Sequence, residues 1–310
     1  MRLRMRTAAT LALLVLAATA CSKATQSGTS SGGGSTGGGA KHVTVRLGIE
    51  DFGAEPEILG AIYTQALQKA GYTVQLVKTK SREVAAPAFA SGQMDVLLEY
   101  AGSDLTFLTK KTLTDEAQVL SALKSYYASK NVTVLDPAPM SDQQGVAATK
   151  ATAGKYSLKT LSDLGKVTTP LTFAGPPECK DRLTCFKGLQ QTYGFQHVKF
   201  QAVGTPGLRY QALQSGQIQV SLVFTTDGQI AKLGLALLDD NKKLFPPDHL
   251  VPLVKSDFLS KAGGDFTSTM NKVSAQITTA DITALNAKVD IDKQDPDTVG
   301  KDYAQQKGLI

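Results

Sequence analysis

The chain has 310 residues, a formal net charge of +6 at pH 7, and 42% hydrophobic and 19% charged residues. This length and composition allow two soluble domains with a sizeable core. The small positive excess, without a basic run interleaved with aromatic residues, argues against nucleic-acid binding. Because tryptophan is absent, an aromatic site must use the 9 tyrosines and 11 phenylalanines.

Residues 1–20 predict a secretory signal peptide. Three early arginines precede an apolar run that is too short to cross a bilayer stably. The run ends at Ala18-Thr19-Ala20-Cys21, which resembles a bacterial lipobox, so we expect cleavage before Cys21 and lipid attachment to it. The alternative is a plain signal peptide with a chance cysteine. Loss of the three arginines lowers the formal charge from +6 by three, to +3.

A Gly/Ser-rich stretch at residues 21–42 follows the signal. Such a composition behaves as a flexible linker, because it has few side chains that can pack. We expect this tether to hold a globular body, which starts at about Val43, away from a membrane.

Strand and helix patterns alternate after the tether, which predicts two α/β lobes with mostly parallel sheets covered by helices. We assign residues 43–144 to the first lobe, 145–240 to the second, and 241–310 to a return to the first. In chain order, the expected strands are 43–49, 72–78, the short Val/Leu run that ends at Tyr100, 131–135, 145–149, 171–174, 198–203, 220–224, 235–238 and 250–254. The expected helices are 57–70, 83–90, 114–130, 157–164, 181–193, 207–214, 266–276, 280–290 and 298–306. A chain that crosses twice between lobes has a two-strand hinge, which suits closure around a ligand.

Two ten-residue stretches, 91–100 and 215–224, share one pattern. Both begin Ser-Gly-Gln, have a valine at the sixth position and end in an aromatic residue, Tyr100 or Phe224. Each predicts a buried strand after a helix, followed by small hydroxyl residues. Ligands of open α/β sheets bind beyond the carboxyl ends of the strands. We therefore expect a cleft with one ring on each wall; coincidence between two core strands is the alternative.

Two cysteines, Cys179 and Cys185, remain once Cys21 is acylated. They lie close together in a polar segment, and outside the cytoplasm we expect them to form a disulfide. Closing so short a loop stabilises the fold by about 2 kcal/mol in the chain-entropy model.

Catalytic motifs are missing from the sequence. The three histidines, His42, His197 and His249, are scattered, and no Gly-x-Ser-x-Gly, His-Glu-x-x-His or P-loop occurs. Asp95 and Glu99 could share a strand face, but the second copy of the repeat has glutamine in place of Asp95, which favours a structural role. We expect a binding protein without a cofactor rather than an enzyme.

Several ordered stretches together resemble the solute-binding proteins of ABC importers for glycine betaine, choline, carnitine and related osmoprotectants. The resemblance covers about Val43 to Ile310. It implies a type II periplasmic-binding-protein fold, an extracytoplasmic location on the cell membrane, and a permease with its ATPase as partners; we expect a monomer. The stretches are Leu47-Gly48-Ile49-Glu50-Asp51-Phe52, Ile58-Leu59-Gly60, Arg82-Glu83-Val84, Glu99-Tyr100-Ala101-Gly102-Ser103, Gly175-Pro176-Pro177-Glu178, Gly207-Leu208-Arg209-Tyr210, Thr225-Thr226-Asp227 and Leu244-Phe245-Pro246-Pro247.

The family holds a quaternary ammonium head in an aromatic cage, because ring faces attract a cation that cannot donate conventional hydrogen bonds. The resemblance assigns Tyr100 and Tyr210 to the cage and places Phe224 where tyrosine is common. Val146 stands where a further aromatic is expected, and the loop after the first strand is one residue longer than the family pattern and lacks its usual glutamine. The remaining candidates follow the two strand ends: Ser103, Thr225 and Asp227.

An acidic cluster begins at the end of the first expected strand, so we expect some of it to border the same cleft. It adds Asp51 and Glu57 to the candidate ligand-binding residues, beside Glu50 and Glu55. Like charges a few ångströms apart repel by about 1–4 kcal/mol, so this wall favours choline-like cations over the carboxylate of betaine. Two alternatives stay open: the same fold binding another amine or polar solute, and an orphan lipoprotein with a sensory or scaffold role.

The lipobox generates a direct prediction. Cys21→Ala removes the acceptor of the lipid, so the protein should move from the membrane fraction to the soluble fraction. Fractionation and the mass of the amino-terminal peptide measure this. If neither changes, the lipoprotein assignment is wrong.

Overall fold

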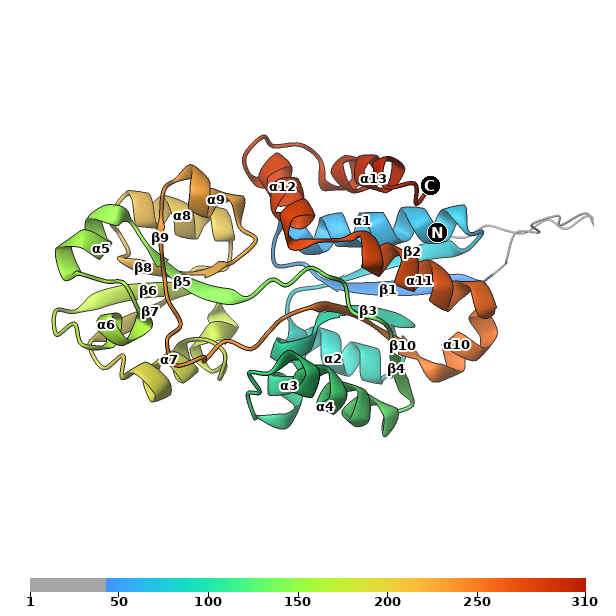
Figure 1. The fold of residues 1–310 in the computed structure, drawn as a ribbon, viewed down its shortest axis with the longest axis horizontal. Coiled ribbons are helices and arrows are strands. Elements are labelled where there is room, and N and C mark those ends of the chain that lie inside the picture. Colours follow the sequence, from blue (N-terminus) through green and yellow to red (C-terminus); the bar gives the residue numbers. More distant parts are fainter. Residues whose placement is uncertain (1–42) are drawn as a thin grey trace, which may run out of the picture. The chain divides into compact units, whose positions relative to one another are not determined.

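A computed structural model describes residues 43–310, which form two α/β lobes, each built on a five-stranded sheet (Figure 1). The predicted signal peptide, the tether and Cys21 lie outside the described residues. Within 43–310, no helix is long and apolar enough to cross a membrane. The predicted two-lobed α/β class is confirmed.

The first sheet has the strand order β2-β1-β3-β10-β4. Strand β1 is parallel to β2 and β3, whereas β10 is antiparallel to β3 and β4. The central strand β3 is buried at every position, as expected for a strand covered on both faces. The strands are β1 (Thr44–Glu50), β2 (Thr73–Thr79), β3 (Val96–Tyr100), β4 (Val132–Val134) and β10 (Leu250–Lys255). The helices of this lobe are α1 (Ala54–Lys69), α2 (Arg82–Ala90), α3 (Ala101–Thr109), α4 (Glu116–Ala128), α10 (Ser256–Ala262), α11 (Gly264–Gln276), α12 (Thr279–Asp290) and α13 (Pro296–Gln306).

The second sheet repeats this arrangement with the order β7-β6-β8-β5-β9. Its strands are β5 (Gln144–Ala148), β6 (Leu171–Gly175), β7 (Val198–Ala202), β8 (Val220–Phe224) and β9 (Ala236–Leu238). Its helices are α5 (Lys150–Tyr156), α6 (Leu161–Gly165), the short 3₁₀ helix η1 (Pro177–Lys180), α7 (Phe186–Tyr193), α8 (Pro206–Gln214) and α9 (Gly228–Lys232). The chain enters this sheet between β4 and β5 and leaves it between β9 and β10.

The sequence repeat corresponds to a structural repeat. Strands β3 and β8 occupy the third position of their sheets, each preceded by a helix, α2 or α8. The residue before each strand also plays the same part. The backbone N–H of Asp95 donates to the Arg46 carbonyl at 2.9 Å, and the Asp95 carboxylate accepts the backbone N–H of Arg46 at 2.9 Å. Gln219 does the same with Thr172, through its backbone N–H at 3.1 Å and its side-chain oxygen at 2.9 Å. Asp95 also forms an ion pair with the Arg46 side chain, so its role is structural, as predicted.

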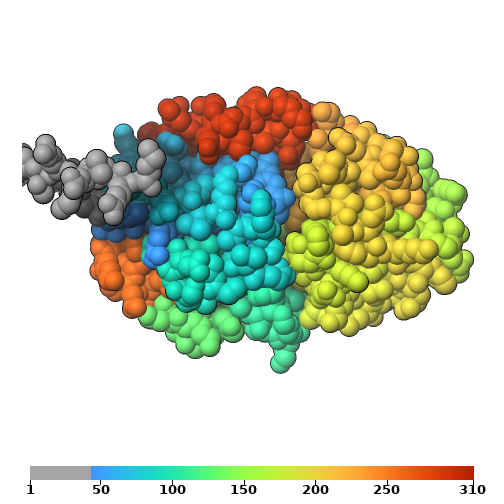
Figure 2. Space-filling view, turned by 180° about the vertical axis from the view of Figure 1, so that it is seen from behind, coloured from blue at the N-terminus to red at the C-terminus, as the bar shows by residue number. Residues whose placement is uncertain are grey.

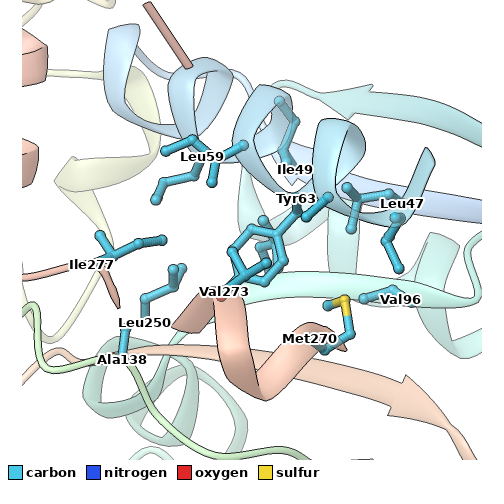
Figure 3. Packing of buried hydrophobic residues seen from close by; sticks show 14 of the residues in the cluster. Leu47, Ile49, Leu59, Tyr63, Val96, Ala138, Leu250, Met270, Val273 and Ile277 are labelled. Atoms are coloured by element: carbon cyan, nitrogen blue, oxygen red, sulfur yellow. The ribbon is translucent and has the colours of Figure 1, made fainter. Parts of the chain in front are cut away.

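The C-terminal helices pack back on the first lobe, as predicted. Helices α11, α12 and α13 all contact α1, and their apolar side chains complete the largest core cluster. Figure 3 shows Met270 and Val273 of α11 directed toward Tyr63 of α1. The Tyr63 hydroxyl lies 2.8 Å from Ser274 Oγ, which ties the two helices together inside the core.

Helix α3, which begins at Ala101 directly after β3, was not predicted, and two predicted helices have other bounds. The helix predicted at 157–164 is displaced, since Ser157 has a positive φ of 54° and ends α5, while the capping box of Thr160 starts α6. The helix predicted at 181–193 begins only at Phe186, because the disulfide loop precedes it.

A close helix contact in the first lobe can be tested. A Cβ on Gly300 of α13 would lie 2.6 Å from Ala61 Cβ and 2.8 Å from the Ile58 carbonyl oxygen of α1. Gly300→Ala should therefore lower the unfolding free energy by about 1–3 kcal/mol through overpacking. Gly264→Ala is the control, because a Cβ there meets nothing within 4 Å. Denaturant unfolding of both variants measures the difference; equal midpoints would contradict this account of the contact.

Candidate functional site

A cavity of about 40 Å³ lies between the two lobes and is lined by residues of both. About 10–15 Å³ is enough for one water molecule, so the lobes lie close together around a small space. In the space-filling view, the yellow surface of the second lobe meets the blue and cyan surface of the first (Figure 2). The carboxyl ends of β1, β3 and β8 contribute residues to the cavity, as the strand-end rule predicts.

Three aromatic rings line this cavity. Tyr100 ends β3, Phe224 ends β8 of the facing lobe, and Phe52 lies in the loop after β1. The Phe52 ring stacks on Phe224 with centroids 5.3 Å apart and is tilted against Tyr100 at 6.0 Å. Phe52 thus connects the two rings that the sequence placed on opposite walls.

The Glu55 carboxylate joins the two lobes beside these rings. Its Oε1 accepts a hydrogen bond from the Tyr100 hydroxyl at 2.6 Å. Its Oε2 accepts from Thr226 Oγ1 of the second lobe at 2.6 Å and from Asn286 Nδ2 of α12 at 2.8 Å. Burial raises the pKa of Glu55, and these three donors oppose that shift. Glu55 therefore fixes the orientation of the Tyr100 hydroxyl and also binds the second lobe through Thr226.

Thr226 lies between two buried carboxyl groups. Its Oγ1 is 2.6 Å from Glu55 and 2.8 Å from Asp142 Oδ1, but a hydroxyl has one proton to donate. Burial, followed by repulsion from Glu55 and Asp227, raises the pKa of Asp142 well above its usual value. A protonated Asp142 that donates to Thr226, while Thr226 donates to Glu55, satisfies all three groups.

A second buried charge cluster surrounds Arg82 at the start of α2. Its guanidinium lies 2.7 Å from Glu99, 3.4 Å from Glu50 and 3.9 Å from Asp104. One arginine thus faces three carboxyl groups in a place shielded from water. Burial, and next the charge of Glu99, raises the pKa of Asp104 to about 8. Glu50 and Arg82 reach the cavity, while Glu99 and Asp104 lie behind it.

A disulfide loop of the second lobe contacts the first lobe. Cys179 is bonded to Cys185, as predicted, with a Cα–Cα distance of 5.2 Å, and both cysteines line the cavity. Within this loop, Arg182 donates two hydrogen bonds to Glu83 of α2, at 2.9 and 2.8 Å. Although burial opposes it, this pair lowers the pKa of Glu83 to about 2. The loop therefore forms a second polar contact between the lobes.

The structure brings some of the sequence candidates together and leaves others apart. Tyr100, Ser103 and Phe224 line the cavity. Val146 is fully buried in the core of the second lobe. The other candidates do not line the cavity and have partners within the protein: Asp51 pairs with Lys80, Glu57 with Lys78, Thr225 with Gln143, and Tyr210 with Asp227.

Tyr210 and Asp227 contact the site indirectly. The Tyr210 hydroxyl donates to the Asp227 carboxylate, which also accepts the backbone N–H of Phe224 at 2.9 Å. The Tyr210 ring packs in a small core of the second lobe. Through these hydrogen bonds, Tyr210 and Asp227 hold the backbone of Phe224 in place and so help to position its ring at the cavity.

Comparison with known proteins identifies the family. A family model described as "Substrate binding domain of ABC-type glycine betaine transport system" matches residues 43–306. The chain belongs to this family. The family is one of transport components that bind solutes, in agreement with the expectation from the sequence.

Three relatives each share 28% identity with this chain. A glycine-betaine-binding protein of Pseudomonas aeruginosa aligns over 87% of this chain and 90% of its own length. The carnitine transport binding protein OpuCC of Listeria monocytogenes aligns over 91% and 92%. The ergothioneine transport permease/ergothioneine binding protein EgtU of Helicobacter pylori aligns over 72% of this chain and 40% of its own length.

A solved structure shows the same fold. The crystal structure of a glycine betaine/carnitine/choline ABC transporter protein superposes with a TM-score of 0.68 at 24% identity, covering 86% of this chain and 99% of that one. The two-lobed fold of the family is therefore also the fold of this chain.

Several cavity residues escaped the sequence analysis of this family member. Phe52 was quoted in a stretch that resembles the family but was not named as a ligand-binding candidate, although its position two residues after β1 is a signal of the same kind as Tyr100 at the end of β3. Arg82, Asp142, Arg182 and Asp248 line the cavity as well. Their charges carry no periodic pattern, so only the fold reveals that they converge.

The Arg82 cluster generates a pH prediction. A folded-state pKa of about 8 for Asp104 exceeds the ordinary value of 3.8, so the folded protein keeps a proton that the unfolded chain releases. This proton contributes fully to the free energy of unfolding below about pH 4. As the pH rises toward 8 the contribution is lost, and the free energy of unfolding falls by about 1.4 kcal/mol for each pH unit. Asp104→Asn should reduce this slope, whereas Asp302→Asn on exposed α13 should not. Denaturant unfolding between pH 5 and 8 is the measurement; identical slopes for wild type and Asp104→Asn would contradict the assignment.

Proposed function

We propose that this protein is the extracytoplasmic solute-binding component of an ABC importer and captures a quaternary ammonium solute between its lobes. One observation carries the proposal: Phe52, Tyr100 and Phe224 gather at one cavity from facing lobes. A trimethylammonium head is attracted by ring faces, with about 0.5–2 kcal/mol per well-placed ring. The names of the relatives, which include betaine- and carnitine-binding proteins, support the same class of ligand.

Charge around the cavity favours a cation over a zwitterion. The carboxyl groups of Glu50, Asp142 and Asp248 line it. The lining cations already have partners within the protein: Lys80 pairs with Asp51, Arg82 with Glu99, Arg182 with Glu83, and Arg209 donates to the backbone carbonyls of Val203, Gly204 and Leu222. A ligand carboxylate would find no cation here that lacks a partner within the protein. Choline-like solutes are therefore preferred over glycine betaine.

Delivery of the solute requires that the protein stay near the membrane. A lipid on Cys21, followed by the Gly/Ser-rich tether, would hold the two lobes within reach of a permease and its ATPase. The polar contacts Glu55–Thr226 and Arg182–Glu83 would then close the lobes over the bound solute. Opening against the permease must break both contacts.

Calorimetry with choline, glycine betaine and carnitine tests the proposal. Phe52→Ala and Tyr100→Ala should each weaken choline binding at least tenfold, because each removes a ring and the second also removes the donor to Glu55. Phe224→Tyr should be tolerated, and Tyr126→Ala on α4, which is outside the cavity, is the aromatic control. Tyr210→Ala should weaken binding by displacing Phe224.

Two results would overturn the proposed function. One is the absence of binding heat with all three solutes. The other is binding that is unaffected by the loss of Phe52 and of Tyr100.

A further inference from the structure

Glu50 is a cavity-lining residue whose buried carboxyl group has one oxygen without a hydrogen-bond donor. It ends β1, two residues before Phe52, and is only 5% exposed. No donor bonds to its Oε1, although this atom is shielded from water. Leaving a buried acceptor without a donor costs about 1–3 kcal/mol, so such a group in a binding cavity calls for an explanation.

The neighbouring arginine does not supply that donor. Arg82 Nε lies 3.4 Å from Glu50 Oε1, but the same guanidinium donates through Nε and Nη2 to Glu99, at 3.1 and 2.7 Å. Arg182 is committed to Glu83. The nearby Asp248 already accepts hydrogen bonds from the backbone N–H and the hydroxyl of Ser103. Arg182 and Asp248 thus have partners of their own, whereas Glu50 Oε1 has no donor; behind the cavity, Asp104 Oδ1 also lacks one.

We propose that Glu50 accepts a hydrogen bond from the polar end of the bound solute, so that the preferred ligand is a quaternary ammonium alcohol or amine with an O–H or N–H donor near its cationic head. This inference rests on the proposed function, since it concerns the same cavity. The rings of Phe52 and Tyr100 hold the head, and the adjacent β1 terminus receives the donor. A betaine-type carboxylate in that place has no proton to donate to Glu50.

Ligand binding then changes the proton occupancy of Glu50. Burial raises the pKa of Glu50 well above its usual value in the empty cavity; Arg82 opposes this shift and Glu99 adds to it. The other charged groups around it are Asp104, Asp248 and Arg182. A cation with a donor favours the ionised carboxylate, so binding should release a proton and tighten as the pH rises.

A pair of matched ligands tests the inference. Choline has a hydroxyl donor, and its O-methyl ether has the same trimethylammonium head without one. Wild type should bind choline at least tenfold more tightly than the ether. Glu50→Leu, which removes the acceptor, should abolish this preference while the ether still binds, and Glu50→Gln, which keeps an acceptor but loses the charge, should reduce it. Glu116→Gln, an equal change of charge on exposed α4, should keep the wild-type preference.

Calorimetry in buffers of different ionisation enthalpy supplies the second measurement. Choline binding to wild type should release a proton, and binding to Glu50→Gln should release less. Equal affinities of wild type for choline and its ether, or a Glu50→Leu variant that keeps the preference, would overturn the role of Glu50 while leaving the aromatic cage in place. If wild type binds neither ligand, the proposed function fails with it.

Discussion

Glu55 accepts hydrogen bonds from side chains that lie far apart along the chain: Tyr100 at the end of β3, Thr226 after β8 and Asn286 on α12. A carboxylate removed from water needs several donors, because its desolvation is costly. These donors come from both lobes and from the C-terminal helices, so Glu55 is fully satisfied only when the three segments meet. The closed cavity and the orientation of the Tyr100 ring both depend on this requirement.

The buried carboxyl groups around Arg82 also need hydrogen-bond donors, but not all of them have one. There Arg82 is shared among Glu50, Glu99 and Asp104, and the donors of this one guanidinium do not satisfy every acceptor. A hydrogen-bond network in which every group has a partner is rigid. A network with an unpaired acceptor can still accept a hydrogen bond from a ligand. In the proposed complex, the rings hold the cationic head between these two clusters. Binding would then combine an apolar contact, which does not depend on the rest of the ligand, with a polar contact that selects for a hydrogen-bond donor.

The sequence predicted the parts of this arrangement that are encoded locally. The repeat at 91–100 and 215–224 located two equivalent strands, and the spacing of Cys179 and Cys185 identified their disulfide. The site itself was harder, because contacts such as Glu55–Thr226 join residues with no local pattern. Tyr210 shows a second limit: the motif identified helix α8 correctly, but neighbouring helix residues point about 100° apart. Arg209 therefore lines the cavity while Tyr210 packs into the core behind it.

The position of β10 has a consequence for the order in which the lobes can fold. Strand β10 lies between β3 and β4, so the first sheet is interrupted until residues 250–255 are in place. The second sheet uses only the continuous segment 144–238 and can form once that segment is available. Joining β3 to β10 closes a loop of some 150 residues, and such non-local contacts slow folding. The second lobe should therefore acquire its structure first, and the N-terminal lobe, although it is synthesised earlier, should be completed last.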